Sequence, residues 1–328
     1  MIPTGAPDRY AVGTPEAAEA LLQDLYVNLR QTLRRWASVT MQTPQPRMGY
    51  VGQHLVSVIT GYPGGRSGAR GDDLKLPDGN TGEIKCCYRV DQLGSCNECG
   101  TVVASIEKVC PNKNCNSRNL QRKDDSKWLL PVKTEAELQE AFTPLYYYFV
   151  LFEFENLASA TAVNVQVSRV DSSAIGFRLC LIDYFFNIRS KSKSKAPFNL
   201  WPASLKFVMM KPHLIYEARI LEDDSIQTSV FPGREPARLQ SVDCLQYYSR
   251  STTLTVSSAC ALAEHFSVSL KKQSKARTLT FLESVRVAQG WSDSDLADVL
   301  AARIYMPRLA DYRTWVDQFA PDAFLFGG

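Results

Sequence analysis

Three charged side chains, Asp73, Glu83 and Lys85, have the types and the spacing that phosphodiester chemistry needs. They lie in the segment Arg70–Tyr88, where two stretches of strand character flank the turn-rich residues PDGNTG, so we predict a β-hairpin. Residues two apart in a strand face the same side, and Glu83 and Lys85 therefore point together while Ile84 faces the core. Two carboxylates on adjacent strands can share one Mg²⁺, which prefers oxygen ligands.

We assign Asp73, Glu83 and the backbone carbonyl of Ile84 as ligands of a catalytic Mg²⁺. Asp72 is the alternative to Asp73, and the sequence leaves this choice open. Lys85 would orient the attacking water and help to deprotonate it, because partial burial lowers the pKa of a lysine and an ammonium stabilises developing negative charge. The pattern therefore indicates metal-assisted phosphodiester cleavage.

A cysteine module follows the hairpin. The motifs Cys-Asn-Glu-Cys and Cys-Pro-Asn-Lys-Asn-Cys stand ten residues apart and supply Cys96, Cys99, Cys110 and Cys115. Two such pairs are typical of a closed tetrahedral zinc site, which is structural because no coordination position is left open. The five other cysteines, Cys86, Cys87, Cys180, Cys244 and Cys260, are expected to be small buried residues.

The net charge of the 328-residue chain is only +3, but its basic residues are clustered in windows without acids. One such window alone is also typical of a solvated loop, whereas several together favour a polyanionic partner. The residues that we predict to contact DNA are Arg66, Arg70, Lys108, Lys113, Arg118, Arg122, Lys123, Arg189, Lys191, Lys193, Lys195, Lys271, Lys272 and Lys275.

The order of the apolar patterns predicts an α/β fold with a helical C-terminal region, into which the cysteine pairs place a zinc-binding insert. Helices are predicted at 15–38, 48–60, from Thr134 onward, and at 256–268, 278–289 and 292–304; strands are predicted at 72–76, 83–90, 128–132, 145–154, 162–170, 176–188, 205–210 and 214–220. The predicted domains are an N-terminal helical region (1–47), a catalytic domain (48–230) with the zinc module (94–123) inserted, and a helical accessory domain (231–328) that is a candidate for DNA binding.

Several classes of protein find no support in the residues. The glycine-rich link 61–71 lacks the Lys-Ser/Thr of a nucleotide-binding P-loop, so we expect no nucleotide cofactor. Only three histidines occur, far apart, and no nucleophile elbow is present. The apolar run 145–154 is too short to span a membrane. The first twenty residues show no secretion signal, which together with the cysteine usage predicts a cytoplasmic location.

The order of a helix, the link GGRSGARG, Asp73, a hairpin and Glu83-x-Lys85 resembles the PD-(D/E)XK nuclease superfamily and, within it, type II restriction endonucleases. The resemblance covers residues 48–90 and extends to the following strand–helix–strand only as topology. Many members carry a metal-binding glutamate on the preceding helix, where this chain has Gln53. Gly71-Asp72 stands in place of the proline that precedes the first acid in the family. The adjoining cysteines resemble zinc-containing restriction enzymes of the MamI or DpnI kind.

The resemblance implies a PD-(D/E)XK core, in which helices flank a mixed central sheet. It also implies a Mg²⁺-dependent, sequence-specific endonuclease of double-stranded DNA. We expect a homodimer, because two symmetric sites cut both strands of a palindrome most simply. The alternatives are a repair or recombination nuclease of the same superfamily and a zinc-containing DNA-binding protein without catalysis. The base-reading region stays open between the zinc module, the loop 189–195 and the C-terminal helices, whose arrangement is compatible with a helix-turn-helix.

Overall fold

The structure is a computed structural model, and it describes residues 12–40, 47–65, 73–88, 93–104, 107–121, 127–154, 162–193, 197–202, 204–232 and 275–327. The chain forms two compact units, each described by itself below. The first unit comprises Met1–Lys127, Tyr148–Ser168 and Leu214–Glu235, and the second comprises Trp128–Tyr147, Arg169–His213 and Pro236–Gly328. The domain limits predicted at residues 47 and 230 stay a prediction. Across the described ranges, no helix is long and apolar enough to cross a membrane.

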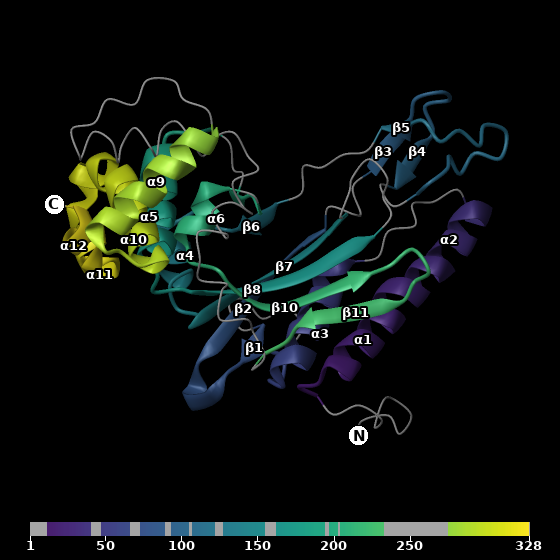
Figure 1. The fold of residues 1–328 in the computed structure, drawn as a ribbon, viewed down its shortest axis with the longest axis horizontal. Helices are drawn as coiled ribbons and strands as arrows, with labels where there is room; N and C mark the ends of the chain where they lie inside the picture. The colour runs from purple at the N-terminus through teal and green to yellow at the C-terminus, as the bar shows by residue number, and fades with distance from the viewer. Residues whose placement is uncertain are drawn as a thin grey trace. The chain divides into compact units, whose positions relative to one another are not determined.

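A six-stranded sheet with the order β1-β2-β7-β8-β10-β11 dominates the first unit (Figure 1). Its strands are β1 (Leu74–Lys75), β2 (Thr81–Tyr88), β7 (Tyr146–Phe154), β8 (Val163–Asp171), β10 (His213–Ile220) and β11 (Ile226–Val230). An antiparallel pair closes each end of the sheet, β1 with β2 and β10 with β11. Helices and sheet together confirm the mixed α/β class, and the predicted hairpin is present, with a short 3₁₀ turn, η2 (Pro77–Gly79), between its strands.

The helices of the first unit line one face of this sheet (Figure 1). They are α1 (Pro15–Leu22), the π-helical segment η1 (Gln23–Asn28), α2 (Leu29–Thr40) and α3 (Met48–Thr60). Thr14 caps α1 by accepting a hydrogen bond from the backbone N–H of Ala17 at 3.3 Å, and α3 ends at Gly61, whose φ of 73° is the left-handed conformation that glycine adopts readily. Both predicted N-terminal helices are therefore confirmed.

Helix α3 approaches strand β2 closely because Gly52 has no side chain. A Cβ atom at Gly52 would lie 2.9 Å from Cβ and 3.0 Å from Sγ of Cys86, and 3.5 Å from Cγ2 of Val150. Both neighbours stand on the sheet face that packs against α3. This glycine therefore sets how near the next residue of the helix, Gln53, comes to the hairpin.

Gly52→Ala is expected to lower the free energy of unfolding by about 1–3 kcal/mol, because the added methyl group overpacks the α3–β2 contact. Gly49→Ala is the matched control on the same helix, since a Cβ there would meet nothing within 4 Å. The control should raise stability by about 0.5–1 kcal/mol through the better helix propensity of alanine. Urea denaturation of both variants measures the difference, and equal shifts would contradict the close packing of α3.

A separate three-stranded sheet, with the order β4-β3-β5, carries the cysteine module. Its strands are β3 (Leu93–Cys96), β4 (Val102–Ala104) and β5 (Leu120–Gln121). Its small core consists of Cys96, Val103 and Cys110, with Cys115 and Leu120 packed against them. With so few apolar side chains, this sheet needs an additional source of stability.

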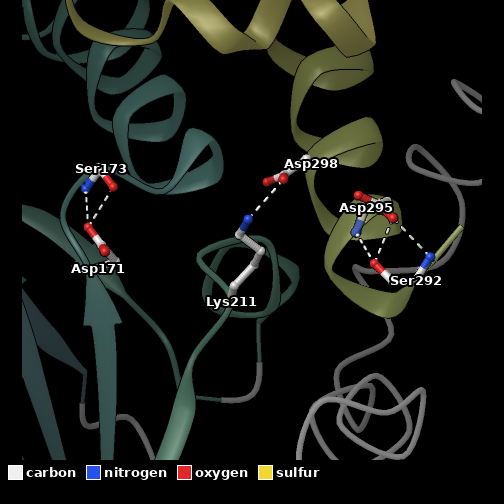
Figure 2. A network of polar contacts seen from close by, with 6 residues as sticks. All are labelled: Asp171, Ser173, Lys211, Ser292, Asp295 and Asp298. Carbon is white, nitrogen blue, oxygen red and sulfur yellow. Dashed lines mark hydrogen bonds and ion pairs between the residues drawn. The ribbon is translucent and has the colours of Figure 1, made fainter.

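The second unit is mostly helical. It contains the pair β6 (Trp128–Leu130) and β9 (Phe198–Leu200), and the helices α4 (Glu135–Glu140), α5 (Ile175–Asp183), η4 (Tyr184–Arg189), α6 (Leu205–Met209), α9 (Lys275–Gln289), α10 (Asp293–Tyr305), η6 (Met306–Tyr312), α11 (Arg313–Phe319), η7 (Pro321–Ala323) and α12 (Phe324–Gly327). Helix α10 packs against α5 and α6. Lys211, which follows α6, forms an ion pair of 2.8 Å with Asp298 on α10 (Figure 2). Ser292 and Asp295 form the capping box at the start of α10 (Figure 2).

Two predicted strands in this unit are wrong. Residues 176–188 and 205–210 were expected to be strands, but they lie in α5 with η4 and in α6. In α5 nearly every residue is buried, so the helical period of polar positions is missing and the segment reads like a buried strand. The signal that could have identified α6 is Ser204, whose hydroxyl accepts from the N–H of Phe207 at 3.3 Å. The helix predicted at 256–268 lies outside the described residues.

Candidate active site and cysteine module

The first carboxylate lies next to the last described pair of the hairpin ladder. Among the described residues, β1 pairs with β2 through Leu74 with Gly82 and Lys75 with Thr81. Asp73 directly precedes Leu74, and its Oδ2 accepts a hydrogen bond of 2.9 Å from the backbone N–H of Ile84. A side chain thus takes the place of the next ladder bond, and the Asp73 carboxylate is held beside the Glu-Ile-Lys segment.

Glu83 and Lys85 stand on the same face of β2, as the strand period predicts. Ile84 between them is buried, with 5% of its surface exposed. The Lys85 ammonium forms an ion pair with Oε1 of Glu83, and both side chains are largely buried, 20% and 13% exposed. The second oxygen, Oε2 of Glu83, is buried and accepts no hydrogen bond from any described residue. A buried carboxylate oxygen without a partner is the mark expected of a cation ligand.

The electrostatics of Glu83 follow from this placement. Burial raises the pKa of Glu83 above its ordinary value, the neighbouring Lys85 lowers it in part, and the Asp73 carboxylate raises it further. Two carboxylates and one ammonium on this part of the hairpin have the chemistry to bind a divalent metal and hold a water molecule beside it.

Gln53 on α3 is brought to this site by the fold. Its Nε2 donates a hydrogen bond of 2.8 Å to Oδ1 of Asp73, so the two oxygens of Asp73 are held by Gln53 and by Ile84. A neutral amide orients the carboxylate without adding a negative charge. The structure thus places Gln53 beside the acid, whereas the alternative acid, Asp72, lies outside the described residues.

The described start of the glycine-rich link, residues 61–65, runs along the outer edge of β1. The N–H of Gly65 donates to the carbonyl of Asp73 at 3.0 Å, and the N–H of Lys75 donates to the carbonyl of Pro63 at 2.9 Å. These bonds fix the backbone at the first acid and directly after it. The predicted DNA contacts Arg66 and Arg70, farther along this link, lie outside the described residues.

The four cysteines of the two motifs converge, as their spacing predicts. Their Sγ atoms all lie within 4.8 Å of one another. The distance is 3.7 Å between Cys96 and Cys115 and 3.6 Å between Cys99 and Cys110. A tetrahedron with metal–sulfur bonds of about 2.3 Å has sulfur–sulfur edges of about 3.8 Å. The cluster therefore has the size and donor set to hold a metal ion.

Tight turns position each cysteine pair. Gly100 follows Cys99 with a φ of 70° and donates its N–H to the carbonyl of Cys96 at 2.9 Å. In the second loop, the N–H of Cys115 donates to the carbonyl of Asn112 at 2.9 Å. The backbone thus shapes both halves of the sulfur cluster.

Two residues that sequence reasoning missed support the most exposed sulfur. The Thr101 hydroxyl lies 3.1 Å from Sγ of Cys99, and the Asn112 amide donates to the same sulfur at 3.8 Å. Contact with the side chain and backbone of Thr101 lowers the pKa of the Cys99 thiol to about 6, which favours the metal-binding thiolate at neutral pH. Only the position of Thr101 two residues after a cysteine hinted at this role.

Thr101→Val is expected to weaken zinc binding by about 10- to 100-fold, because valine keeps the shape of the side chain but removes the hydrogen bond to Cys99. Titration against a chromogenic chelator measures the affinity. Ser117→Ala is the matched control, since the Ser117 hydroxyl accepts from the N–H of Asn119 within the same module. An unchanged zinc affinity in Thr101→Val would contradict the role of the hydroxyl.

The predicted DNA contacts differ in their surroundings. Lys113 and Arg118 are exposed on the cysteine module, and Lys193 is exposed after η4. Lys108 pairs with Glu222 at 3.6 Å, Lys191 donates to Asn187 at 3.1 Å, and Arg189 is partly buried. Lys275 begins α9, and the structure does not describe its side chain. The predicted contacts outside the described residues are Arg66, Arg70, Arg122, Lys123, Lys195, Lys271 and Lys272.

Comparison with known proteins shows which family the sequence of this chain matches. The family model of the MamI restriction endonuclease matches residues 35–243, more than half of the chain. The chain belongs to the MamI restriction endonuclease family. The matched residues include α3, the hairpin with Asp73, Glu83 and Lys85, and the whole cysteine module. The resemblance to restriction enzymes of this kind is therefore confirmed for the chain.

Among curated proteins, the type II restriction enzyme MamI of Microbacterium ammoniaphilum is similar to this member of the MamI family. The two sequences are 40% identical over 65 residues, a match that covers 19% of this chain and 21% of the relative. The match thus spans about a fifth of the relative's length. No solved structure matches the chain.

Proposed function

We propose that this chain is a Mg²⁺-dependent, sequence-specific endonuclease of double-stranded DNA with a PD-(D/E)XK catalytic core. Two observations on the β1–β2 hairpin carry the proposal. Asp73 is bonded to the backbone of the segment that holds the Glu83–Lys85 ion pair. Oε2 of Glu83 is buried and has no hydrogen-bond partner among the described residues. Membership in the MamI restriction endonuclease family supports DNA as the substrate.

The residues present fit a hard divalent cation. Asp73, Glu83 and the carbonyl oxygen of Ile84 would hold Mg²⁺, and the remaining positions would go to water and a phosphate oxygen. A cation bound there would neutralise the phosphate and acidify a water molecule. Gln53 keeps the Asp73 carboxylate in place through its 2.8 Å hydrogen bond. Lys85, paired with Glu83, would orient the attacking water. After giving up its own proton to solvent, its neutral amine would accept the proton of the water, and the ammonium formed in this way would stabilise the developing charge.

The cysteine cluster would hold zinc in a structural role. Four thiolates leave no position for water or substrate, so the cluster has no place in the hydrolysis. Its contribution would be to stabilise the small β4-β3-β5 sheet, whose core is too small to stand alone. We further propose a homodimer, in which two copies of the site cut the two strands of a symmetric sequence.

Digestion of a sequence-defined plasmid with Mg²⁺ tests the function. Discrete fragments that map to one short sequence are the expected result. Progressive shortening from the ends, or nicking that follows DNA structure, would instead indicate a repair or recombination nuclease. Failure of the purified zinc-loaded protein to cut any DNA would favour a binding protein without catalysis.

Exchanging Asp73 and Asp72 in turn for asparagine tests which of the two binds the catalytic metal. Asp73→Asn is expected to reduce the cleavage rate by at least about 100-fold, since a change even outside the ligand shell of a metal typically costs 10- to 100-fold. Asp72→Asn should cleave at close to the wild-type rate. Single-turnover cleavage of a labelled duplex measures both, and the reverse ranking would assign the role to Asp72.

A further inference from the structure

The second cysteine loop carries a set of polar side chains that the protein itself does not use. Lys113, Asn114 and Arg118 are all exposed on this loop. Among the residues that the structure describes, their side chains make no hydrogen bond or ion pair: the N–H of Asn114 donates to Oδ1 of Asn112 at 3.0 Å, but that bond involves only the backbone of Asn114. These three side chains are thus available to a ligand.

Several other basic groups in the described ranges are paired with an acid. Lys108, on the same module, faces Glu222 at 3.6 Å. Lys211 is held by Asp298 at 2.8 Å (Figure 2), and Arg308 is held by Asp183 at 2.7 Å. Sequence clustering alone could not separate the free cations from these paired ones.

The segment Cys110–Arg118, which carries the three side chains, is held at several points. Cys110 and Cys115 belong to the sulfur cluster, and the N–H of Cys110 donates to the carbonyl of Ser117 at 2.8 Å. Inside the loop, the Asn116 side chain donates to the carbonyl of Lys113 at 3.0 Å, and Asn116 itself has a φ of 50°. A side chain on a fixed backbone loses little conformational entropy on binding, so such a loop is suited to specific recognition.

The chemistry of the three residues matches the edges of purine bases. Arginine and lysine donate to O6 and N7 of guanine, and asparagine pairs with N6 and N7 of adenine, in the major groove of DNA. Lys113 and Arg118 are only five positions apart in the sequence, so the three side chains fall within reach of a few neighbouring base pairs. A purely electrostatic anchor would not need the amide of Asn114.

We propose that the loop Cys110–Arg118 reads bases in the major groove of the DNA substrate, with Lys113, Asn114 and Arg118 as the specificity-determining side chains. This inference rests on the proposed endonuclease function and adds to it the region that reads the sequence. Strand β3 begins five residues after the end of β2, a span of at most about 18 Å. This short connection tethers the module to the hairpin that carries the proposed catalytic residues.

End sequencing of digested genomic DNA first defines the cut sequence of the wild-type protein. The same profile is then recorded for Lys113→Ala, Asn114→Ala and Arg118→Ala in the full chain, with zinc content checked for each variant. Loss of preference at one or two defined base pairs in each variant is the expected result. Arg118→Lys keeps the charge but loses the paired donors, so it should retain zinc and still lose preference at one position.

Binding separates base reading from simple phosphate contact. In a Lys85→Ala background, affinities are measured for the wild-type site duplex and for a duplex with a single substituted base pair, at several salt concentrations. Asn114→Ala and Arg118→Ala should weaken binding to the site duplex by about 5- to 150-fold and remove the difference between the duplexes at one position. Lys75→Ala, which removes an exposed cation outside the predicted DNA contacts, is the charge control and should leave that difference unchanged.

Two results would overturn the inference while leaving the endonuclease function intact. One is an unchanged cut profile in a variant that combines all three alanine substitutions and keeps its zinc. The other is an equal loss of affinity for both duplexes, which would make the loop a phosphate anchor. If the wild-type protein cuts no DNA at all, the proposed function fails first.

Discussion

Replacing Lys85 with alanine is expected to slow DNA cleavage by about 10²–10⁴-fold, the range over which a positioned proton acceptor contributes to a rate. Lys85 is the one cation paired with Glu83 among the described residues. Its loss removes the group that would take up the proton of the attacking water, and also the positive charge that stabilises the buried Glu83 carboxylate. DNA binding should persist, because the change leaves the exposed basic side chains untouched. Single-turnover cleavage with Mg²⁺ and a separate binding titration measure the two effects.

Lys75→Ala is the matched control for this experiment. Lys75 belongs to the same hairpin, but it is exposed on β1. Its removal changes the net charge equally and should leave the cleavage rate close to that of the wild type. Cleavage that survives Lys85→Ala would remove Lys85 from the mechanism, and an equal loss in Lys75→Ala would reduce its effect to general electrostatics.

Cys110→Ser is expected to reduce the zinc content of the purified chain from one ion to well below one, with zinc affinity lowered by more than about 100-fold. Cys110 is buried, at 3% exposure, in the small core of the module, and its sulfur lies 3.6 Å from that of Cys99. A serine there offers a weaker ligand and leaves a polar group in the core. Loss of zinc should unfold the β4-β3-β5 sheet, because structural zinc supplies folding free energy.

Metal analysis of the purified chain and limited proteolysis check this prediction. Cleavage by the protease should move into residues 93–121 in the serine variant. The matched control is Cys180→Ala, which removes a buried cysteine of the second unit that is outside the sulfur cluster. The control should keep one zinc per chain. A full complement of zinc in Cys110→Ser would exclude this cysteine as a ligand.

The two experiments address separate sites. Asp73 and Glu83 offer hard oxygen atoms, which suit Mg²⁺, and the cysteines offer soft thiolates, which suit zinc. A chelator selective for zinc should therefore first disturb the module, while addition of Mg²⁺ alone should not restore it. This separation follows from the ligand chemistry at each position.

Local spacing in the sequence was sufficient to predict the hairpin, the shared face of Glu83 and Lys85, and the convergence of four cysteines. Each of these depends on geometry within a few residues, since the strand period and the tight turns act along the chain. The same local reasoning placed strands at 176–188 and 205–210, where the structure has helices, because a fully buried segment carries no polar period.

Only the tertiary structure decided which side chains surround these local motifs. Gln53 reaches Asp73 across 20 residues of sequence because Gly52 lets α3 pack closely on β2, and the sequence offers no spacing rule for such a contact. Burial likewise leaves Oε2 of Glu83 without a hydrogen-bond partner among the described residues. Packing also decides which basic side chains form ion pairs, as Lys108 and Lys211 do. The residue types thus specified the chemistry that the chain can perform, while packing between distant segments decided which of those residues meet.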